Sequence, residues 1–276
     1  MREELVSAPA PQGVAAPHDY AGGIGRPIRA AVEWFGGIGL FAARVVRAAF
    51  KRPFEWHELI RQLDEVGSKS AGLVALAGAA IGVVVTLETR DSLVRFGAKG
   101  ALPALVILSI LRITGPIITA LVVSGRVAAG IGAELGAMKV TEQIDAMEVS
   151  AVDPHKYLAS TRVIACMLML PLLTLICDAS GIFMGWITNA VAEPMSLTRF
   201  LNAGLQRVGF SDFLPPTLKT VVFGFIIGLV ASFQGMRASG GTQGVGAAAT
   251  SSVVLASLFV IIADVFMVRL ILDFFG

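Results

Sequence analysis

Hydrophobic and polar positions divide the chain into a polar front and a strongly apolar body. Seventeen of the 42 charged residues fall before Ser70, and the other 25 are spread over the remaining 207 residues. Five apolar stretches in the body each approach the roughly 20 residues that a helix needs to cross a bilayer. They cover residues 70–87, 101–123, 161–191, 217–233 and 251–272. The pattern predicts an all-α integral membrane protein with about five transmembrane helices.

The pattern changes twice before the first of these spans. Residues 1–26 are rich in Ala, Pro and Gly and lack apolar periodicity, which predicts a disordered cytosolic tail. From Ile28 to Phe50 apolar residues recur at helical spacing and basic residues gather toward the end. This is typical of an amphipathic helix lying in the membrane interface. A more polar helix follows at residues 55–65, so residues 27–66 are expected to form interfacial and elbow helices.

Composition and charge support the membrane class and exclude others. Charged residues make up 15% of the chain, hydrophobic residues 55%, and mean hydropathy is +0.76, which excludes a disordered, collagen-like or disulfide-scaffold protein. A net charge of +2 gives no support to a nucleic-acid partner. Counting Lys and Arg in the loops gives fourteen on the side of the N-terminus and six on the other. Because basic residues favour cytoplasmic loops, we expect a cytoplasmic N-terminus and an outer C-terminus.

Small residues within the spans predict close helix packing. Pairs of glycines four positions apart allow helix backbones to approach in lipid, and they occur at Gly78 and Gly82, Gly181 and Gly185, and Gly224 and Gly228. Gly115 and Pro116 interrupt the second span, because proline removes a backbone donor and clashes with the preceding turn. Pro171 lies in the third span, which is long for one straight helix, so we expect that span to be kinked, tilted or divided.

No catalytic or metal-binding constellation emerges from the sequence. All three histidines lie outside the predicted spans, without a second ligand at metal-binding spacing. Ionisable residues inside apolar spans are more informative, because their burial is costly and they normally face the bundle or a wet cavity. Arg112, Asp178 and Asp264 are of this kind. One hypothesis pairs Arg112 with Asp264 or Asp178 beside a substrate path, and a purely structural ion pair explains the pattern equally well.

The most distinctive polar segment, Arg126 to Pro154, follows the second span and is expected on the cytosolic side. It is mostly compatible with helix and combines an apolar edge with an acidic one. The residues that we assign to a docking surface are Glu134, Met138, Lys139, Glu142, Asp145, Met147 and Glu148. A short amphipathic helix of this kind suits a groove on a partner protein, although a solvated loop helix would show the same pattern.

The run GPIITALVVSGRVAAGIGAELGAMKVTEQIDAMEVSAVDPHKYL, from Gly115 to Leu158, closely resembles the signature region of the MlaE/YrbE family of ABC transporter permeases. The similarity continues upstream through residues 81–100 and downstream to the last span. The resemblance implies that residues 67–276 form the permease transmembrane domain and that residues 134–149 form the coupling helix. It also implies a bacterial cytoplasmic (inner) membrane, a homodimer, a cytosolic ABC ATPase dimer and an MCE-domain lipid-binding protein on the outer side.

Such systems move phospholipids, or sterols and fatty acids, between membrane and envelope. The resemblance implies that this chain carries no cofactor and catalyses nothing itself, with ATP and Mg bound by the ATPase. A lipid path would run past Glu88, Arg90, Arg112, Ile113, Asp178 and Asp264. Many relatives have a glutamate where this chain has Ile113, and often neutral Gln and an aromatic residue in place of Glu88 and Arg90. The headgroup preference of relatives therefore does not transfer.

Two other classes of membrane protein fit the sequence less well. An ion-coupled secondary transporter would use Asp178 and Asp264 to bind protons or sodium, but it would be favoured by inverted repeats, and the five spans show none. An intramembrane enzyme would need paired catalytic groups at a common depth, and the sequence offers no such set. The permease is therefore the preferred interpretation.

Overall fold

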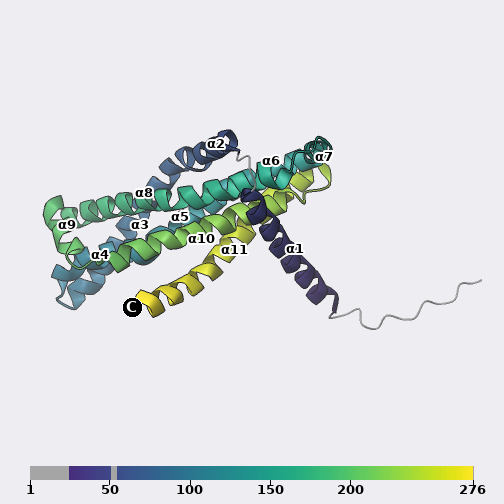
Figure 1. The fold of residues 1–276 in the computed structure, drawn as a ribbon. Coiled ribbons are helices and arrows are strands. Elements are labelled where there is room, and N and C mark those ends of the chain that lie inside the picture. Colours follow the sequence, from purple (N-terminus) through teal and green to yellow (C-terminus); the bar gives the residue numbers. More distant parts are fainter. Residues whose placement is uncertain (1–24, 51–54, 276) are drawn as a thin grey trace, which may run out of the picture. The chain divides into compact units, whose positions relative to one another are not determined.

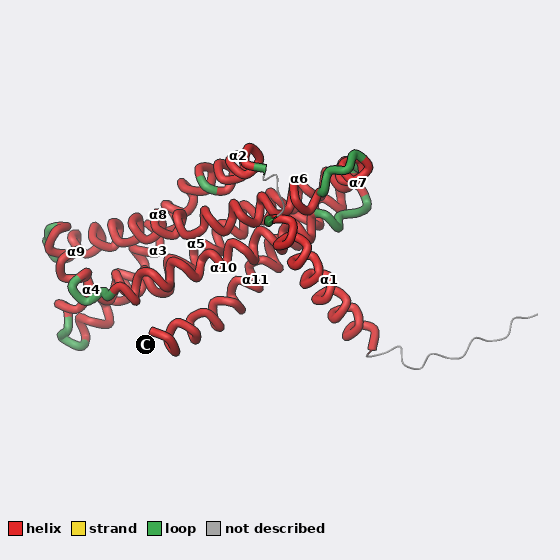
Figure 2. The backbone as a smooth tube through the Cα atoms, in the orientation of Figure 1, coloured by secondary structure: helices red, strands yellow, loops and turns green. Residues whose placement is uncertain are grey.

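The computed structural model describes residues 25–50 and 55–275, which are almost wholly helical and contain no strand. Figure 2 shows the helices joined by short loops. Apart from its last two positions, the tail predicted at residues 1–26 lies outside the described residues. The prediction of an all-α membrane protein is confirmed.

The chain divides into two units between Leu40 and Phe41, and each is described by itself. Helix α1, Gly25–Ala49, contributes to both. In the first unit Val32 and Phe35 lie three positions apart on α1 and are exposed. An apolar helix face of this kind is what an interfacial helix offers to lipid.

The second unit begins with the last turns of α1, which contribute to its core. Phe41, Val45 and Ala48 are buried and share one helix face at i, i+4 and i+7 spacing. The Phe41 ring lies 5.5 Å, between centroids, from the rings of His155 and Phe233. These contacts fix the end of α1 to the segments before the third span and at the end of the fourth.

The rest of the second unit is a bundle of long helices. In chain order its elements are α2 (Trp56–Val66), α3 (Ser68–Arg95), η1 (Lys99–Ala101), α4 (Leu102–Ser109), η2 (Ile110–Thr114), α5 (Gly115–Val123), η3 (Ser124–Ala128), α6 (Ala129–Val140), α7 (Gln143–Val149), η4 (His155–Ser160), α8 (Thr161–Ala192), α9 (Leu197–Leu205), α10 (Phe210–Gly235) and α11 (Gly241–Phe275). Helix α8 packs against both α3 and α10, and α10 against α11. In Figure 1, α7 lies at one end of this bundle and α9 at the other.

Five helical stretches of the described residues are long and apolar enough to cross a membrane, which confirms the predicted number. They are Trp56–Arg95, Lys99–Val140, His155–Ala192, Phe210–Gly235 and Gly241–Phe274. Each is longer than the apolar stretch read from the sequence, because the helices continue beyond the hydrophobic window. The chain is therefore a multi-pass membrane protein.

Proline is accommodated differently in the second and third spans. The π-helical turn η2 ends directly before Gly115 and Pro116, so the helix continues instead of breaking. A π turn is wider than an α turn, which makes room for the pyrrolidine ring. Helix α8 runs through Pro171 without a break. Of the three forms expected for the third span, kinked, tilted or divided, the divided form is therefore excluded.

Glycines bring the helix backbones together at two crossings. A Cβ added to Gly82 on α3 would collide with the carbonyl of Gly181 on α8. Nearer the start of α8, a Cβ at Gly228 of α10 would lie 2.8 Å from the Cα of Val163. Such distances are too short for real side chains, so α8 is held in contact with α3 and α10 at positions where only glycine fits.

Candidate functional site

A buried ion pair joins α10 to α11 inside the bundle. The Lys219 Nζ lies 2.9 Å from the Asp264 Oδ1, and only 1% of the lysine side chain is exposed. The same ammonium donates a hydrogen bond of 3.3 Å to the backbone carbonyl of Arg112 in η2. Three spans are thus tied together at one point. Removing one member of such a pair leaves an uncompensated buried charge, which is strongly destabilising.

The structure corrects the partners that we expected for the intramembrane charges. The Arg112 Nε lies 3.4 Å from the Oδ1 of Asp212, at the start of α10. Asp264 is taken by Lys219, so the hypothesis that Arg112 pairs with Asp264 or Asp178 is wrong. Sequence reasoning missed Lys219 because it counted this residue with the outer loop. Lys219 stands near the start of the predicted span 217–233, but helix α10 begins seven residues before that span, so Lys219 lies well inside the helix and Asp212 belongs to the same helix.

An apolar groove of about 380 Å³ opens beside the Lys219–Asp264 pair. It lies between the first turns of α10 and the last turns of α11, which diverges from α10 in Figure 1. The residues that line it are Phe210, Ser211, Leu214, Pro215, Leu218, Lys219, Val222, Met267, Leu270, Ile271 and Phe274. A lining that is apolar apart from Ser211 and Lys219 is suited to a hydrocarbon chain.

Asp178 lies apart from these charges. It is buried on α8 against Gly115 of α5, and a Cβ at that glycine would collide with the carboxylate. Within the described residues no hydrogen-bond partner reaches either oxygen of Asp178. Ile113, its predicted neighbour on the lipid path, is exposed on η2. The structure therefore does not bring Asp178, Arg112 and Asp264 together into one site.

The C-terminal end of the first span takes part in a cluster around Glu193. Lys99 and Arg90 place a nitrogen 2.9 Å and 3.9 Å from its carboxylate. The hydrogen bond from Lys99, together with the charge of that lysine, holds the pKa of Glu193 below its ordinary value, and Arg90 adds to the effect. Glu88 is exposed and takes no part in these ion pairs. Arg90 therefore has a partner from the third span's end that the sequence did not reveal.

The segment predicted as one coupling helix, residues 134–149, consists of two helices. The end of α6 carries Glu134 to Val140, and α7 begins at Gln143 after a break at Glu142, whose φ of 58° is left-handed. A left-handed residue cannot continue an α-helix. The expectation of a continuous helix is therefore wrong. The segment bends at one end of the bundle, and we call it the α6–α7 elbow, which is distinct from the elbow helices predicted at residues 27–66 (Figure 1).

The two ends of this elbow are fixed by ion pairs. Glu134 lies 2.9 Å from the guanidinium of Arg162 on α8, a side chain that is only 1% exposed. Lys139 lies 2.6 Å from Asp145, which joins α6 to α7 across the break. Ile144 is buried on α7. The elbow is thus anchored to the third span and does not behave as a free loop.

The other residues that we assigned to the docking surface differ in how exposed their side chains are. Met138 and Met147 are half-buried, while Glu142 and Glu148 are exposed. Within the described residues no ion pair is recorded for either of these two glutamates. The acidic surface available to a partner is therefore made by Glu142 and Glu148, together with the exposed flank of Asp145.

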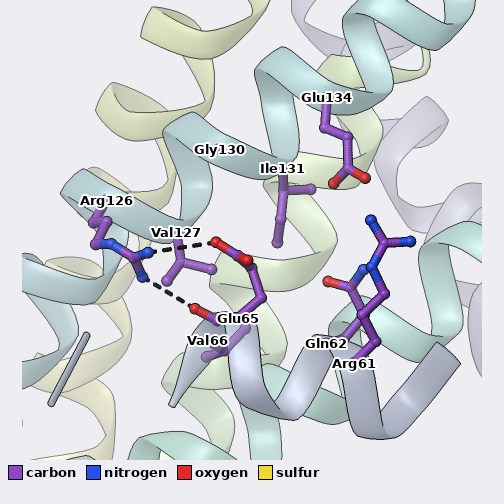
Figure 3. Close-up of a pocket in the computed structure, with 9 residues that line it drawn as sticks. All are labelled: Arg61, Gln62, Glu65, Val66, Arg126, Val127, Gly130, Ile131 and Glu134. Atoms are coloured by element: carbon purple, nitrogen blue, oxygen red, sulfur yellow. Dashed lines mark hydrogen bonds and ion pairs between the residues drawn. The ribbon is translucent and has the colours of Figure 1, made fainter. Parts of the chain in front are cut away.

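A second cavity, of about 360 Å³, lies between α2 and the helix formed by η3 and α6. Figure 3 shows its lining residues: Arg61, Gln62, Glu65, Val66, Arg126, Val127, Gly130, Ile131 and Glu134. Arg126 closes one side by hydrogen bonds of 2.8 Å to the Ser70 hydroxyl and 3.1 Å to the Glu65 carbonyl. No pattern in the sequence indicates this cavity, because the residues that form its two walls are about 60 positions apart. Among the described residues no group of His, Cys, Asp and Glu could hold a metal ion.

Comparison with known proteins places these features in a family. The family profile described as Permease MlaE matches residues 59–270. A probable ABC transporter permease protein of Rickettsia typhi is 34% identical over 234 residues, covering 85% of this chain and 90% of the relative. Protein TRIGALACTOSYLDIACYLGLYCEROL 1, chloroplastic, of Arabidopsis thaliana is 32% identical over 227 residues, covering 82% and 65%.

A probable ABC transporter permease protein of Synechocystis is 33% identical over 208 residues, covering 75% of this chain and 79% of the relative. The profile match takes in the spans from α2 to α11, the elbow and the Lys219–Asp264 pair. The chain therefore belongs to the MlaE permease family.

Proposed function

We propose that this chain is the permease subunit of an ATP-driven ABC transporter that moves lipids between the cytoplasmic membrane and the cell envelope. The observation that carries the proposal is the acidic elbow, exposed at α7 and fixed to the third span through Glu134 and Arg162. A motor protein that moved α7 would act on α8 through α6, which carries Glu134. The sequence has no ATP-binding motif of its own, so ATP and Mg would be bound by a separate cytosolic ATPase.

Contacts beyond the elbow support transmission to the rest of the bundle. Helix α8 packs on α3 and α10 at glycine crossings, where the backbones are too close to slide freely. A displacement of α8 would therefore be passed to its neighbours as a rigid-body shift. In a homodimer, two elbows would receive the closure of an ATPase dimer and rearrange a cavity between the two permease copies.

A lipid substrate fits the groove between α10 and α11. Its walls are largely apolar, which suits acyl chains, and the charge of Lys219, which is one of the lining residues, is already neutralised by Asp264. The name of the Arabidopsis relative refers to a galactolipid. Arg112 and Glu88 would lie along the path, and an MCE-domain protein on the outer side would pass lipid to or from the envelope.

The loop charges support one placement of the chain in the membrane. Residues 27–66 would lie at the inner surface of the bacterial cytoplasmic membrane as interfacial and elbow helices, and residues 67–276 would form the transmembrane domain. The N-terminus would be cytoplasmic and the C-terminus outside. This places the α6–α7 elbow in the cytosol, where an ATPase can reach it.

An ion-coupled secondary transporter is less well supported. It would need Asp264 as an ion ligand, and this carboxylate is already paired with Lys219. Asp178 stands alone on α8. The relatives from Rickettsia typhi and Synechocystis are named as probable ABC transporter permease proteins, a class that is not ion-coupled.

The docking surface is tested by reversing its two exposed charges. The double variant Glu142→Lys, Glu148→Lys should reduce co-purification with the ATPase about tenfold or more, because two favourable charge contacts become repulsive. Reversal of Asp145 would be less clean, because it would also break the ion pair with Lys139. The measurement is the ratio of ATPase to permease after affinity purification from membranes.

A matched control is Asp64→Lys, which reverses an exposed charge on α2. It should leave the ratio unchanged, and all variants should insert and elute as the wild type does in size-exclusion chromatography. Full ATPase binding by the double variant would refute the docking assignment.

A further inference from the structure

The cavity between α2 and α6 has no role in the function proposed above. Four lining residues come from one face of α2, at positions 61, 62, 65 and 66, and the facing helix contributes positions 127, 130, 131 and 134. Both sets follow the i, i+3, i+4 pattern of helix faces that normally pack together. Here α2 packs on α8 and α3 instead. Two opposed faces therefore enclose an open space.

The size and position of the cavity match a ligand site. Its volume of about 360 Å³ lies within the range of small-molecule pockets. Gly130 on the α6 wall leaves room, because a Cβ added there would meet no atom within 4 Å. Val66 precedes the apolar stretch of the first span and Val127 follows that of the second. The cavity thus lies where two spans reach the polar boundary of the membrane.

The charges around the cavity are mixed and are not all used. In Figure 3 the guanidinium of Arg61 and the carboxylate of Glu134 point toward one another across the opening, and the described structure records no ion pair between them. Arg61 has one long contact of 3.6 Å, to Glu58, and its side chain is 68% exposed. Glu134 uses its Oε2 for Arg162, which leaves Oε1 for another donor.

This arrangement selects the charge of the ligand. A simple anion would meet the carboxylates of Glu65 and Glu134, and a simple cation would meet Arg61 and Arg126. A ligand with both charges close together would satisfy both sides, with a phosphate on the Arg61 guanidinium and an ammonium on Glu134. No aromatic ring is among the nine lining residues, so a quaternary ammonium would lack the ring faces that bind it best. A primary ammonium, which donates hydrogen bonds, fits better.

We propose that the cavity between α2 and α6 binds the phosphoethanolamine headgroup of a membrane phospholipid. Bound there, the headgroup would bridge Arg61 on α2 and Glu134 on α6, and so would link the elbow to the membrane surface. The site does not depend on lipid transport by this chain. It lies beside the elbow, away from the groove at Lys219, so failure of either proposal leaves the other standing.

The test counts the lipid that stays on the full-length chain. The purified protein is delipidated, reconstituted in vesicles of equal parts phosphatidylethanolamine and phosphatidylcholine, extracted again and examined by native mass spectrometry. We expect the wild type to retain phosphatidylethanolamine in preference to phosphatidylcholine. Gly130→Leu, which fills the cavity, and Arg61→Gln, which removes the phosphate ligand, should each lower that retention about tenfold or more.

Two matched variants control for general effects on lipid binding. Gly72→Leu adds the same side chain at an exposed glycine of α3 with nothing within 4 Å. Arg95→Gln removes an exposed arginine that, like Arg61, pairs within its own helix. Both should retain lipid as the wild type does. Equal retention by Gly130→Leu and Gly72→Leu, or a preference of the wild type for phosphatidylcholine, would overturn the proposal.

A further arm separates the source of the headgroup. Soluble glycerophosphoethanolamine is added to the delipidated protein in detergent, and its binding is measured by calorimetry. Weak or absent binding, with retention of the whole lipid, supports a membrane lipid. Binding as tight as that of the lipid would assign the site to a soluble compound and overturn the membrane source.

Discussion

A lysine inside an apolar helix needs a partner, because its ammonium loses several kcal/mol of hydration when it leaves water. Lys219 has two: the carboxylate of Asp264 and the carbonyl of Arg112. Because these groups belong to three spans, the position of each side chain depends on all of them. Arg112 itself turns to Asp212, where 42% of its side chain stays exposed. One charge is therefore structural and the other open to a ligand.

Removal of Lys219 should reveal this difference. Lys219→Met leaves Asp264 buried without a cation, which we expect to cost about 3–5 kcal/mol of stability. The double variant Lys219→Met, Asp264→Leu removes both charges and should recover much of that loss, since well-packed apolar residues can replace a buried pair. Thermal unfolding of the detergent-solubilised protein, followed by size-exclusion chromatography, measures both.

The control for this pair lies further along the same helix. Arg269 and Asp273 on α11 are largely exposed, and such a pair contributes about 0–1 kcal/mol. Arg269→Met should therefore change the unfolding temperature little. Equal destabilisation by Lys219→Met and Arg269→Met would show that the buried pair contributes no more than a surface one.

The sequence identified which charges were unusual but not who their partners were. Arg112 and Asp264 stood out because they interrupt apolar runs. Asp212 did not, because residues 210–216 contain two prolines and read as a loop, and Lys219 did not, because it stands near the edge of the predicted span directly after them. Those prolines lie inside α10, which continues past them although they cannot donate the usual backbone hydrogen bonds to residues 211 and 212. Which residues pair with Arg112 and Asp264 depends on where α10 starts, and the hydropathy pattern does not locate that start.

Among the elements, α8 is the one on which the bundle is organised. It meets α3 through the glycines at 78, 82, 181 and 185, and α10 through those at 224 and 228. With no hydrophobic effect between helices in lipid, close backbone contact must supply much of the association energy. The spacing of glycines along the sequence was therefore a sound guide to which helix faces meet.

Adding a methyl group at one crossing should separate the helices. Gly82→Ala would drive its Cβ into the backbone of Gly181, so α3 or α8 must shift, and overpacking of this kind typically costs about 1–3 kcal/mol. Gly72→Ala, on the same helix but with open space around it, should be neutral or stabilising. The thermal unfolding temperatures of the two variants provide the comparison. Similar values would mean that the crossing relaxes without cost.

The boundaries of the elements were harder to predict than their existence. The break at Glu142 has no glycine or proline to mark it, and a left-handed glutamate is stabilised by its surroundings rather than by its own propensity. The ion pair of Lys139 with Asp145 across the break is one such stabilising contact. The elbow therefore results from tertiary contacts, which a helical pattern of apolar and acidic residues does not encode.

In the second unit, residues 41–276, the three groups of charged residues lie at different positions along the bundle. The acidic elbow lies at one end, the Glu193 cluster at the other, and the Lys219–Asp264 pair lies within the spans. If the function proposed here is correct, work done at the elbow must reach the groove between α10 and α11. The route through Glu134, Arg162 and α8 joins these regions by direct contacts.

Glu134→Gln should cut this route while sparing the docking surface. The amide keeps the size of the side chain but loses the charge that neutralises the buried Arg162 guanidinium. We expect ATPase binding to persist, because Glu142 and Glu148 are untouched, and lipid transfer between reconstituted vesicles to fall about tenfold relative to ATP hydrolysed. Loss of ATPase binding in parallel with transfer would place Glu134 in the docking surface instead. Transfer and hydrolysis at wild-type ratio would show that the force reaches α8 by another contact.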